Sequence, residues 1–487
     1  MAIYHPDYRL WLISEVDNDY VVGKFRQSVL GYFAVLMVFL LVTGAFSRYI
    51  SRNEAVRRRQ LRFQATHDPL TGLPNRNYLI EQFPRWVEEG GRFSLFFVDL
   101  DSFKGINDNF GHSVGDRLLE VLARRFAALV ETQDLLIRHG GDEFVLLVSG
   151  PSPECRAAAL CRRIFEVCQD ITVDGMMFSP GCSVGIAHYP EHGQELDELL
   201  RAADLAMYEA KIERNTYRTY HSDIEDAYVQ QSRIEHLLRG ATQRGEIHMN
   251  YQPQVDSEGH LHGVESLVRW KNPELGMVPP DQFIGVAERT GQMSALGRFI
   301  LEQSLCDFAS LLTRSSHRFS LSINISVRQF AEASFSEDLL ANLARFGLET
   351  DTVCLEITES TLVEALDRVQ QILWFLHRQG LATSLDDFGT GYSSLAILKD
   401  LPFNEIKIDK SFVDNITEDE SGQHLVRNII SIGHNYGMAV LAEGVETREQ
   451  FDLLKSYGCD LFQGYYFSRP LTLEALEAYM VRGGQVK

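Results

Sequence analysis

The sequence predicts an α/β protein of two domains, the second a TIM-like (β/α)8 barrel, preceded by one transmembrane helix. Three features support this prediction. In residues 228–487, predicted strands alternate with helices, and successive strands end in a polar residue, as in a barrel. In residues 60–222, a buried strand and a hairpin are mixed with helical segments. Near the N-terminus, one apolar run carries no charge, and the 487 residues suffice for two or three domains.

The apolar run occupies residues 28–47, and no charged residue lies between Arg26 and Arg48. A stretch of this length can cross a bilayer as a helix. Arginines dominate the residues that follow, so the positive-inside rule predicts that the chain after Arg48 is cytoplasmic. The alternatives are a cleaved signal peptide, which would start nearer to Met1, and a buried core helix. Residues 1–27 are then a short extracytoplasmic segment or the remnant of a larger sensor.

Residues 48–66 are predicted to form a helical linker that leads into the first domain. Tyr49, Val56 and Phe63 recur at seven-residue spacing, a pattern that favours a parallel dimer. Arginines occupy much of the remaining surface, and a solvated connector is the alternative interpretation.

The composition limits the classes of partner. The net charge of −21 argues against general nucleic-acid binding, which depends on cations that neutralise phosphates. The many carboxylates can instead be concentrated in metal sites. The seven cysteines form no CxxC or Cys/His ligand set, so reduced, cytosolic thiols are expected.

The first domain, residues 60–222, contains a buried strand, FSLFFVDLD, that ends at Asp99 and Asp101. A polar, glycine-containing loop is expected over residues 102–116, and a helix from there to Val130. A hairpin then turns at two glycines and presents Asp142 and Glu143. A strand-end acid and a hairpin acid can share Mg²⁺ with substrate phosphates. A tight hairpin with solvated acids is the alternative.

This domain resembles the GGDEF diguanylate cyclase family through DPLTGLPNR, DLDSFKGINDNFGHSVGD and GGDEF at residues 140–144. The resemblance implies a nucleotide-cyclase-like α/β fold in which two domains meet, each holding GTP with Mg²⁺. It implies Asp99 and Asp142 as metal ligands and Glu143 as the acid that binds metal or deprotonates the 3′-hydroxyl. The remaining residues implied to bind substrate are Asn107 and Asp116, which read guanine, with Lys104, His112, Lys211 and Arg214.

Two departures from the family pattern affect this domain. The Arg-x-x-Asp product-inhibition motif would fall on residues 131–134, which read Glu-Thr-Gln-Asp, so that site is expected to be lost. The family's Lys-x-x-Gly-Arg-Asn turn is represented by KIERN at residues 211–215, which is one residue shorter and lacks glycine.

The second domain, residues 228–487, carries polar residues where predicted strands give way to loops. These strands read LHGVE, FSLSIN, VCLE, LATSLDD, EIKI, MAVLAE and DLFQ, and HMNYQPQV precedes them. The polar residues are Glu265, Asn324, Glu356, Asp386, Asp387, Lys407, Glu443 and Gln463. In a (β/α) barrel the carboxyl ends of the strands converge on one mouth. So many carboxylates would repel one another without cations, which predicts a divalent-metal site suited to phosphate chemistry.

This domain resembles the EAL family of cyclic-di-GMP phosphodiesterases over nearly its whole length, with the signature present as Glu265-Ser266-Leu267 followed by Arg269. The resemblance implies a barrel whose first strand is antiparallel to the others and which holds two Mg²⁺ or Mn²⁺ ions. The implied metal ligands are Glu265, Asn324, Glu356, Asp386 and Asp387. Lys407 is implied to orient the attacking water, Glu443 to act as general base, and Gln463 to help position the water. Gln252, Leu267 and Arg269 are the implied substrate contacts, and Glu359 anchors the DDFGTGYSS loop.

Together these features predict a single-pass bacterial inner-membrane protein with cytoplasmic catalytic domains, expected to be a homodimer. Its main expected activity is hydrolysis of cyclic-di-GMP to linear pGpG, with a GGDEF domain that binds GTP and is either a second enzyme or a regulator. The alternatives are net diguanylate cyclase activity, a non-catalytic cyclic-di-GMP receptor, and another metallophosphoesterase such as a nuclease.

Overall fold

The computed structural model describes residues 2–13, 18–88, 91–149, 153–315, 318–330, 332, 334–389, 398 and 400–481. The chain divides into two compact units, Met1–Tyr228 and Val229–Lys487, which are considered separately below.

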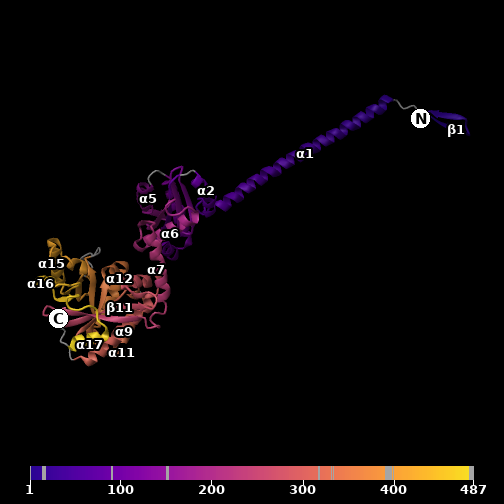
Figure 1. Cartoon of the computed structure of the whole chain (residues 1–487). Helices are drawn as coiled ribbons and strands as arrows, with labels where there is room; N and C mark the ends of the chain where they lie inside the picture. The colour runs from indigo at the N-terminus through magenta and orange to yellow at the C-terminus, as the bar shows by residue number, and fades with distance from the viewer. Residues whose placement is uncertain are drawn as a thin grey trace. The chain divides into compact units, whose positions relative to one another are not determined.

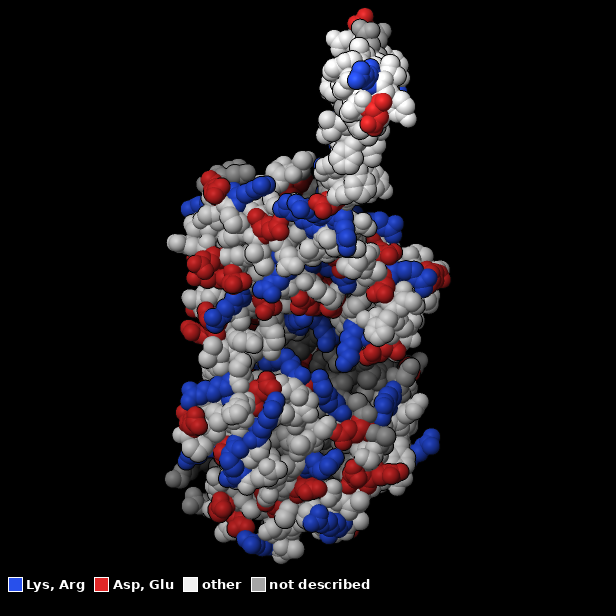
Figure 2. Space-filling view, turned by 90° about the vertical axis from the view of Figure 1, so that its right-hand side faces the viewer, with Lys and Arg blue, Asp and Glu red and all other residues white. Residues whose placement is uncertain are grey.

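The first unit opens with a small hairpin and one long helix. Strands β1 (Ala2–His5) and β2 (Leu10–Ile13) pair antiparallel, and α1 runs from Asn18 to Thr66. Helix α1 is long and apolar enough to cross a membrane, and the described side chains of its apolar part are exposed. It is the indigo helix of Figure 1, and in the space-filling view the projecting segment is mostly free of charged side chains (Figure 2).

The body of this unit is a sheet with helices on both faces. Its helices are α2 (Arg76–Glu88), α3 (Phe103–Phe110), α4 (His112–Ala127), α5 (Pro153–Val167) and α6 (Leu196–Glu213). Its strands are β3 (Phe93–Leu100), β4 (Leu135–Gly140), β5 (Glu143–Ser149), β6 (Ile171–Val173), β7 (Met176–Phe178), β8 (Cys182–Tyr189) and β9 (Tyr217–Thr219). The main sheet has the order β4-β5-β3-β8-β9, and β6 pairs with β7 separately.

Alternation along β3 decides which helices face the first-domain acids. Phe96 and Val98 pack in one core with α4 and α5, whereas Leu95 and Phe97 pack in another with α2 and α6. Side chains two residues apart point to the same face of a strand, so Asp99 points to the face covered by α2 and α6. The expected hairpin is confirmed as β4 and β5.

The prediction of a loop over residues 102–116 is wrong. Residues 103–110 form α3, and α4 starts at His112, with only Gly111 between them. Gly111 has φ 85°, a backbone conformation that favours glycine, and it turns the chain from one helix into the next. The apolar residues Phe103 and Val114 are buried and hold the helices on the domain, a signal hidden among the polar residues of this segment.

The second unit is a barrel entered through α7 (Ser222–Leu238), a helix that begins in the first unit. Its strands are β10 (Ile247–Asp256), β11 (Leu261–Asn272), β12 (Gly276–Val278), β13 (Ser320–Asn324), β14 (Val353–Thr358), β15 (Ala382–Phe388), β16 (Glu405–Ile408), β17 (Ala439–Ala442) and β18 (Leu461–Gln463). Its helices are α8 (Pro280–Thr290), α9 (Met293–Arg314), α10 (Val327–Phe330), α11 (Phe335–Phe346), the 3₁₀ turn η1 (Thr350–Thr352), α12 (Glu359–Arg378), α14 (Lys410–Val413), α15 (Glu420–Asn435), α16 (Arg448–Ser456) and α17 (Leu473–Val481).

The predicted eight-stranded barrel is confirmed. The order β10-β18-β17-β16-β15-β14-β13-β11 is closed by the pairing of β10 with β11, and β12 extends β11 outside the ring. Strand β10 is antiparallel to both of its neighbours, as expected, and the other pairs of the ring are parallel. Helices such as α9, α11, α12 and α15 lie outside the strands (Figure 1).

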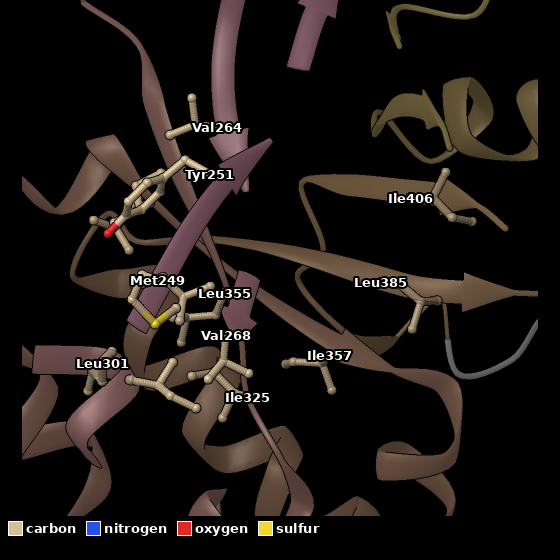
Figure 3. Close-up of a cluster of buried hydrophobic side chains, with 14 of the residues drawn as sticks. Met249, Tyr251, Val264, Val268, Leu301, Ile325, Leu355, Ile357, Leu385 and Ile406 are labelled. Carbon is tan, nitrogen blue, oxygen red and sulfur yellow. The ribbon is translucent and has the colours of Figure 1, made fainter. Parts of the chain in front are cut away.

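The strands alternate between an apolar outer face and a polar inner face. Val264, Leu355, Ile357, Leu385 and Ile406 belong to the buried apolar core of this unit (Figure 3). Each is next in sequence to a polar residue expected at the mouth, so the polar neighbours point to the opposite, inner face. This alternation places the predicted site inside the barrel.

One strand-end expectation is wrong. Glu265 lies in the middle of β11, which continues to Asn272 because its second half forms a hairpin with β12. The ladder between β11 and β13 nevertheless stops at Ser266, so Glu265 still lies at the rim of the closed ring. The DDFGTGYSS loop spans residues 386–394, and its part from residue 390 onward lies outside the described residues.

Candidate functional site

The mouth of the barrel is organised around the ammonium of Lys407, which is fully buried. Its Nζ lies 2.6 Å from Glu443 Oε1, 3.0 Å from Glu356 Oε2, 3.4 Å from Asp386 Oδ1 and 3.8 Å from Glu265 Oε2. These four carboxylates come from four different strands or strand ends. The ring of acids is therefore held together by a cation that the chain itself supplies.

Glu265 is also oriented by two amides. Asn324 Nδ2 donates to Glu265 Oε1 at 2.7 Å, and Gln463 Nε2 donates to Glu265 Oε2 at 2.5 Å. Gln463 Oε1 in turn accepts from Gln254 Nε2 at 3.0 Å. Gln254 was not expected from the sequence, since a glutamine one position past a proline resembles ordinary strand sequence.

Burial and crowding of charge move the pKa values in this site in different directions. Burial raises the pKa of Glu356 far above its ordinary range, and the Glu265 charge adds to the effect. Burial, partly offset by Lys407, raises the pKa of Glu443 to about 8. Burial also opposes the charged form of Glu265, but Lys407 and the amide donors outweigh it and lower the pKa. The carboxylates raise the pKa of Lys407 well above its usual value despite its burial.

The donor set fits a divalent cation. Both carboxylate oxygens of Glu356 are buried and accept no well-directed hydrogen bond, so they are free to ligate. Carboxylate and amide oxygens are the ligands that Mg²⁺ and Mn²⁺ prefer. In the part of the chain that the structure describes, no group of three or more His, Cys, Asp or Glu side chains is drawn together tightly enough to hold an ion. The acids surround Lys407 instead, and ligation requires their carboxylates to turn from it.

The other residues predicted for this site lie around the same mouth. Asp387 follows Asp386 with φ 55°, and burial with the Asp386 charge raises its pKa to about 6. Gln252 Oε1 is 3.5 Å from Gln463 Nε2, and Gln252 is directly opposite Glu265 in the β10–β11 ladder. Leu267 and Arg269 follow along β11, beyond the closed ring.

Glu359 lies at the first turn of α12 and is 4% exposed. Its Oε2 accepts from the backbone N–H of Gly389 at 3.4 Å. Gly389 is the last described residue before residues 390–397, so the predicted anchor contacts the start of the loop.

The first unit brings its acids together with a lysine. Asp99 and Glu143 are directly opposite in the β3–β5 ladder, and Lys211 Nζ on α6 lies 2.9 Å from Asp99 Oδ1. Burial raises the pKa of Asp99, against the effect of Lys211 and with that of the Asp142 charge. Burial and the Asp99 charge likewise raise the pKa of Glu143. An excess of negative charge therefore remains for a cation to neutralise.

The predicted guanine readers also lie close together. Asn107 Oδ1 is packed against Gly115, leaving no space for a Cβ there, and Asp116 is the next residue. Lys104, His112 and Arg214 are exposed. Arg214 has φ 59° at the end of α6, so the shortened turn takes up the conformation that a glycine would favour.

Sequence reasoning missed three residues of this unit. Arg138 Nη1 forms an ion pair with Asp68 at 2.8 Å, and Arg138 Nε donates to Gly141 O at 3.0 Å, so this side chain ties the hairpin turn to the entry segment. Asp204 lies two helical turns before Lys211 on α6, and its charge contributes to the raised pKa of Glu143. Arg138, two residues before the Gly-Gly turn, is the signal that could have revealed the first contact.

Comparison with protein-family models identifies both units. The model described as "Diguanylate cyclase, GGDEF domain" matches residues 65–216, and the model described as "EAL domain" matches residues 235–470. The "Bifunctional diguanylate cyclase/cyclic di-GMP phosphodiesterase MucR" of Pseudomonas aeruginosa is 36% identical over 457 residues, which are 91% of this chain and 67% of that protein. The chain belongs to the tandem GGDEF–EAL family.

A second relative also matches most of this chain. The "Cyclic di-GMP phosphodiesterase NbdA" of Pseudomonas aeruginosa is 35% identical over 427 residues, 86% of this chain and 54% of that protein. The chain thus spans two thirds of the first of these GGDEF–EAL relatives and about half of the second. A solved structure, "Structure of EAL Enzyme Bd1971 - cAMP and cyclic-di-GMP bound form", is 26% identical with a TM-score of 0.51 and covers 70% of this chain and 82% of its own.

Proposed function

We propose that the EAL barrel hydrolyses cyclic-di-GMP to linear pGpG. The observation that carries the proposal is the ring of Glu265, Glu356, Asp386 and Glu443 around the buried Lys407. Membership of a family whose named relatives include cyclic-di-GMP phosphodiesterases supports it. EAL enzymes depend on divalent metal, and the acids of this mouth supply the charge that such ions need.

Two Mg²⁺ or Mn²⁺ ions are proposed here, held by Glu265, Asn324, Glu356, Asp386 and Asp387. When bound, such ions polarise the phosphate and lower the pKa of water enough to provide hydroxide at neutral pH. Glu356 is fully buried and, apart from the Lys407 ammonium at 3.0 Å, its carboxylate oxygens have no hydrogen-bond partner among the described residues, so a bound cation would stabilise its ionised form.

The remaining residues position the water and the substrate. Glu443 accepts the proton of the attacking water at its carboxylate, and Lys407 orients that water through its ammonium. Attack on phosphorus breaks the P–O3′ bond of one of the two phosphodiester linkages in the ring, which leaves a 5′-phosphate and, once the departing oxygen takes up a proton, a free 3′-hydroxyl. Gln463 helps to position the water, and Gln252, Leu267 and Arg269 contact the cyclic dinucleotide.

The GGDEF domain is proposed to bind GTP with Mg²⁺ at Asp99, Asp142 and Glu143. Asn107 and Asp116 read the guanine, and Lys211 pairs with phosphate once metal has taken its place at Asp99. The facing pair Asp99 and Glu143 favours cyclase activity as the second candidate function of this chain.

The protein is proposed to be anchored in the bacterial inner membrane by α1, with both domains in the cytoplasm. The long apolar helix with arginines on its C-terminal side supports this orientation. A homodimer is proposed because each GGDEF domain would hold only one of the two GTP molecules that a cyclase joins.

Purified residues 60–487, incubated separately with GTP and with cyclic-di-GMP in Mg²⁺ or Mn²⁺, test this order of activities. We expect pGpG from cyclic-di-GMP, and Glu265→Ala is expected to abolish its formation. Asp142→Ala, which lies in the other domain, is the matched control and should retain hydrolysis. Accumulation of cyclic-di-GMP from GTP with no hydrolysis would reverse the assignment.

A further inference from the structure

Gln254 lies directly beneath the mouth of the barrel and is 1% exposed. It is two residues after Gln252 on β10, so both side chains point to the interior, with Gln254 one layer deeper. In the ladders it is opposite Gln463 on one side and Gly263 on the other. This position puts its amide next to the residue that donates to Glu265.

We infer that Gln254 is a positioning residue that fixes the orientation of the Gln463 amide and, through it, the Glu265 carboxylate. The inference rests on the proposed metal-dependent hydrolysis at this mouth. The hydrogen bonds run in one direction, because Gln254 Nε2 donates to Gln463 Oε1 at 3.0 Å and Gln463 Nε2 donates to Glu265 Oε2. An amide has one oxygen and one NH₂ group, so occupying the oxygen leaves the NH₂ to face the carboxylate.

Without the Gln254 donor, the orientation of the Gln463 amide would depend on Glu265 itself and on the long contact of 3.5 Å from Gln463 Nε2 to Gln252 Oε1. A flipped amide would turn its oxygen toward the carboxylate and repel it. Glu265 would then be less well held for a metal. Residues that orient metal ligands typically contribute about 10- to 100-fold to metal affinity or activity when removed.

Gly263 provides the space that Gln254 needs. A Cβ at position 263 would lie 2.9 Å from Gln254 Oε1 and would also collide with Ser320. The absence of a side chain on this neighbouring strand therefore allows the Gln254 amide to lie flat against β11 and reach Gln463.

Gln254 also lines a cavity of about 460 Å³ that opens at the opposite end of the barrel. His262, Ser322 and Glu405 are among the other lining residues. Since one side of the Gln254 side chain faces this space, a methionine of similar length can be accommodated without overpacking. Position 254 can therefore be changed without unfolding the barrel.

The test compares the full chain with Gln254→Met, Gln463→Met, the double variant and His262→Ala. Isothermal titration with Mn²⁺ gives the dissociation constant, and steady-state hydrolysis of cyclic-di-GMP gives kcat and KM. We expect Gln254→Met to weaken Mn²⁺ binding by about 10-fold or more and to lower kcat with little change in KM. In the double variant, Gln254→Met is expected to add no further loss to Gln463→Met, because it acts through that residue.

His262→Ala, which alters the same cavity outside the amide chain, is the control and should bind Mn²⁺ as the wild type does. Unchanged Mn²⁺ affinity in Gln254→Met, additive losses in the double variant, or an equal loss in His262→Ala would each overturn the inference. A wild-type protein that binds Mn²⁺ but leaves cyclic-di-GMP intact would refute the proposed function alone, because the affinities still decide the role of Gln254. A wild-type protein that binds no Mn²⁺ would refute both.

Discussion

The residue that most changes the interpretation of the sequence is Lys407. Its sequence position predicts a lysine among strand-end acids, but not that its ammonium lies within 3.8 Å of four carboxylates and is fully buried. From the sequence, the acids are expected to repel one another unless cations are bound. The chain already provides one cation, and only a three-dimensional arrangement of four strand ends reveals it.

Replacing Lys407 by methionine should therefore destabilise the metal-free protein at neutral pH. Removing one partner of a buried ion pair costs about 3–5 kcal/mol, because the remaining charge is uncompensated. We expect a lower thermal midpoint without metal and a larger stabilisation by Mg²⁺ than in the wild type, measured by calorimetry. Equal midpoints in the absence of metal would contradict this. Lys410→Met, at an exposed ion pair, is the control.

The raised pKa of Glu443 predicts that metal binding depends on pH. With a pKa raised to about 8, this carboxyl is mainly protonated at pH 7 in the metal-free protein. A cation favours the ionised form, so metal binding should release protons below pH 8 and affinity should rise with pH up to that point. Titration calorimetry at pH 6–9 in buffers of different ionisation enthalpy measures both quantities. Affinity independent of pH, without proton release, would show that the acids are already ionised.

At the scale of elements, strand order and alternation could be predicted because both depend on local patterns of apolar and polar residues. The barrel ring and the hairpin that carries Asp142 and Glu143 follow from this. The helix α3 could not be predicted, because its mainly polar sequence reaches the core through the buried Phe103 and the partly buried Ile106, and the glycines of residues 102–116 fitted a loop. The extension of β11 past Glu265 depends on pairing with β12, a non-local partner.

Close packing of α15 against the strands that carry Lys407 and Glu443 predicts a second stability effect. A Cβ at Gly433 would lie 2.5 Å from Val440 Cγ2 and 3.1 Å from Ile406 Cγ2. Gly433→Ala should therefore cost about 1–3 kcal/mol through overpacking. Gly285→Ala, in α8 with only an arginine end nearby, is the matched control and should be neutral or stabilising by up to about 1 kcal/mol. Denaturant unfolding measures both, and equal effects would contradict the packing argument.

At the scale of the whole molecule, the two units have separate hydrophobic cores. The described residues of α1 do not belong to these cores. This separation predicts that removal of residues 1–47 moves the protein from the membrane fraction to the soluble fraction. The kcat for cyclic-di-GMP should change less than about 3-fold, which corresponds to under ~1 kcal/mol in activation free energy. Fractionation after an alkaline wash and hydrolysis assays measure the two outcomes. Full-length protein released by the wash would show that α1 does not span the bilayer.

A barrel that carries its own counter-ion can complete its biogenesis before any metal is loaded. The nascent chain then does not need to capture a metal ion in order to neutralise the charge of its interior. Loading then becomes a late and reversible event, so that the amount of working enzyme in a cell can follow the supply of free divalent ions without new synthesis.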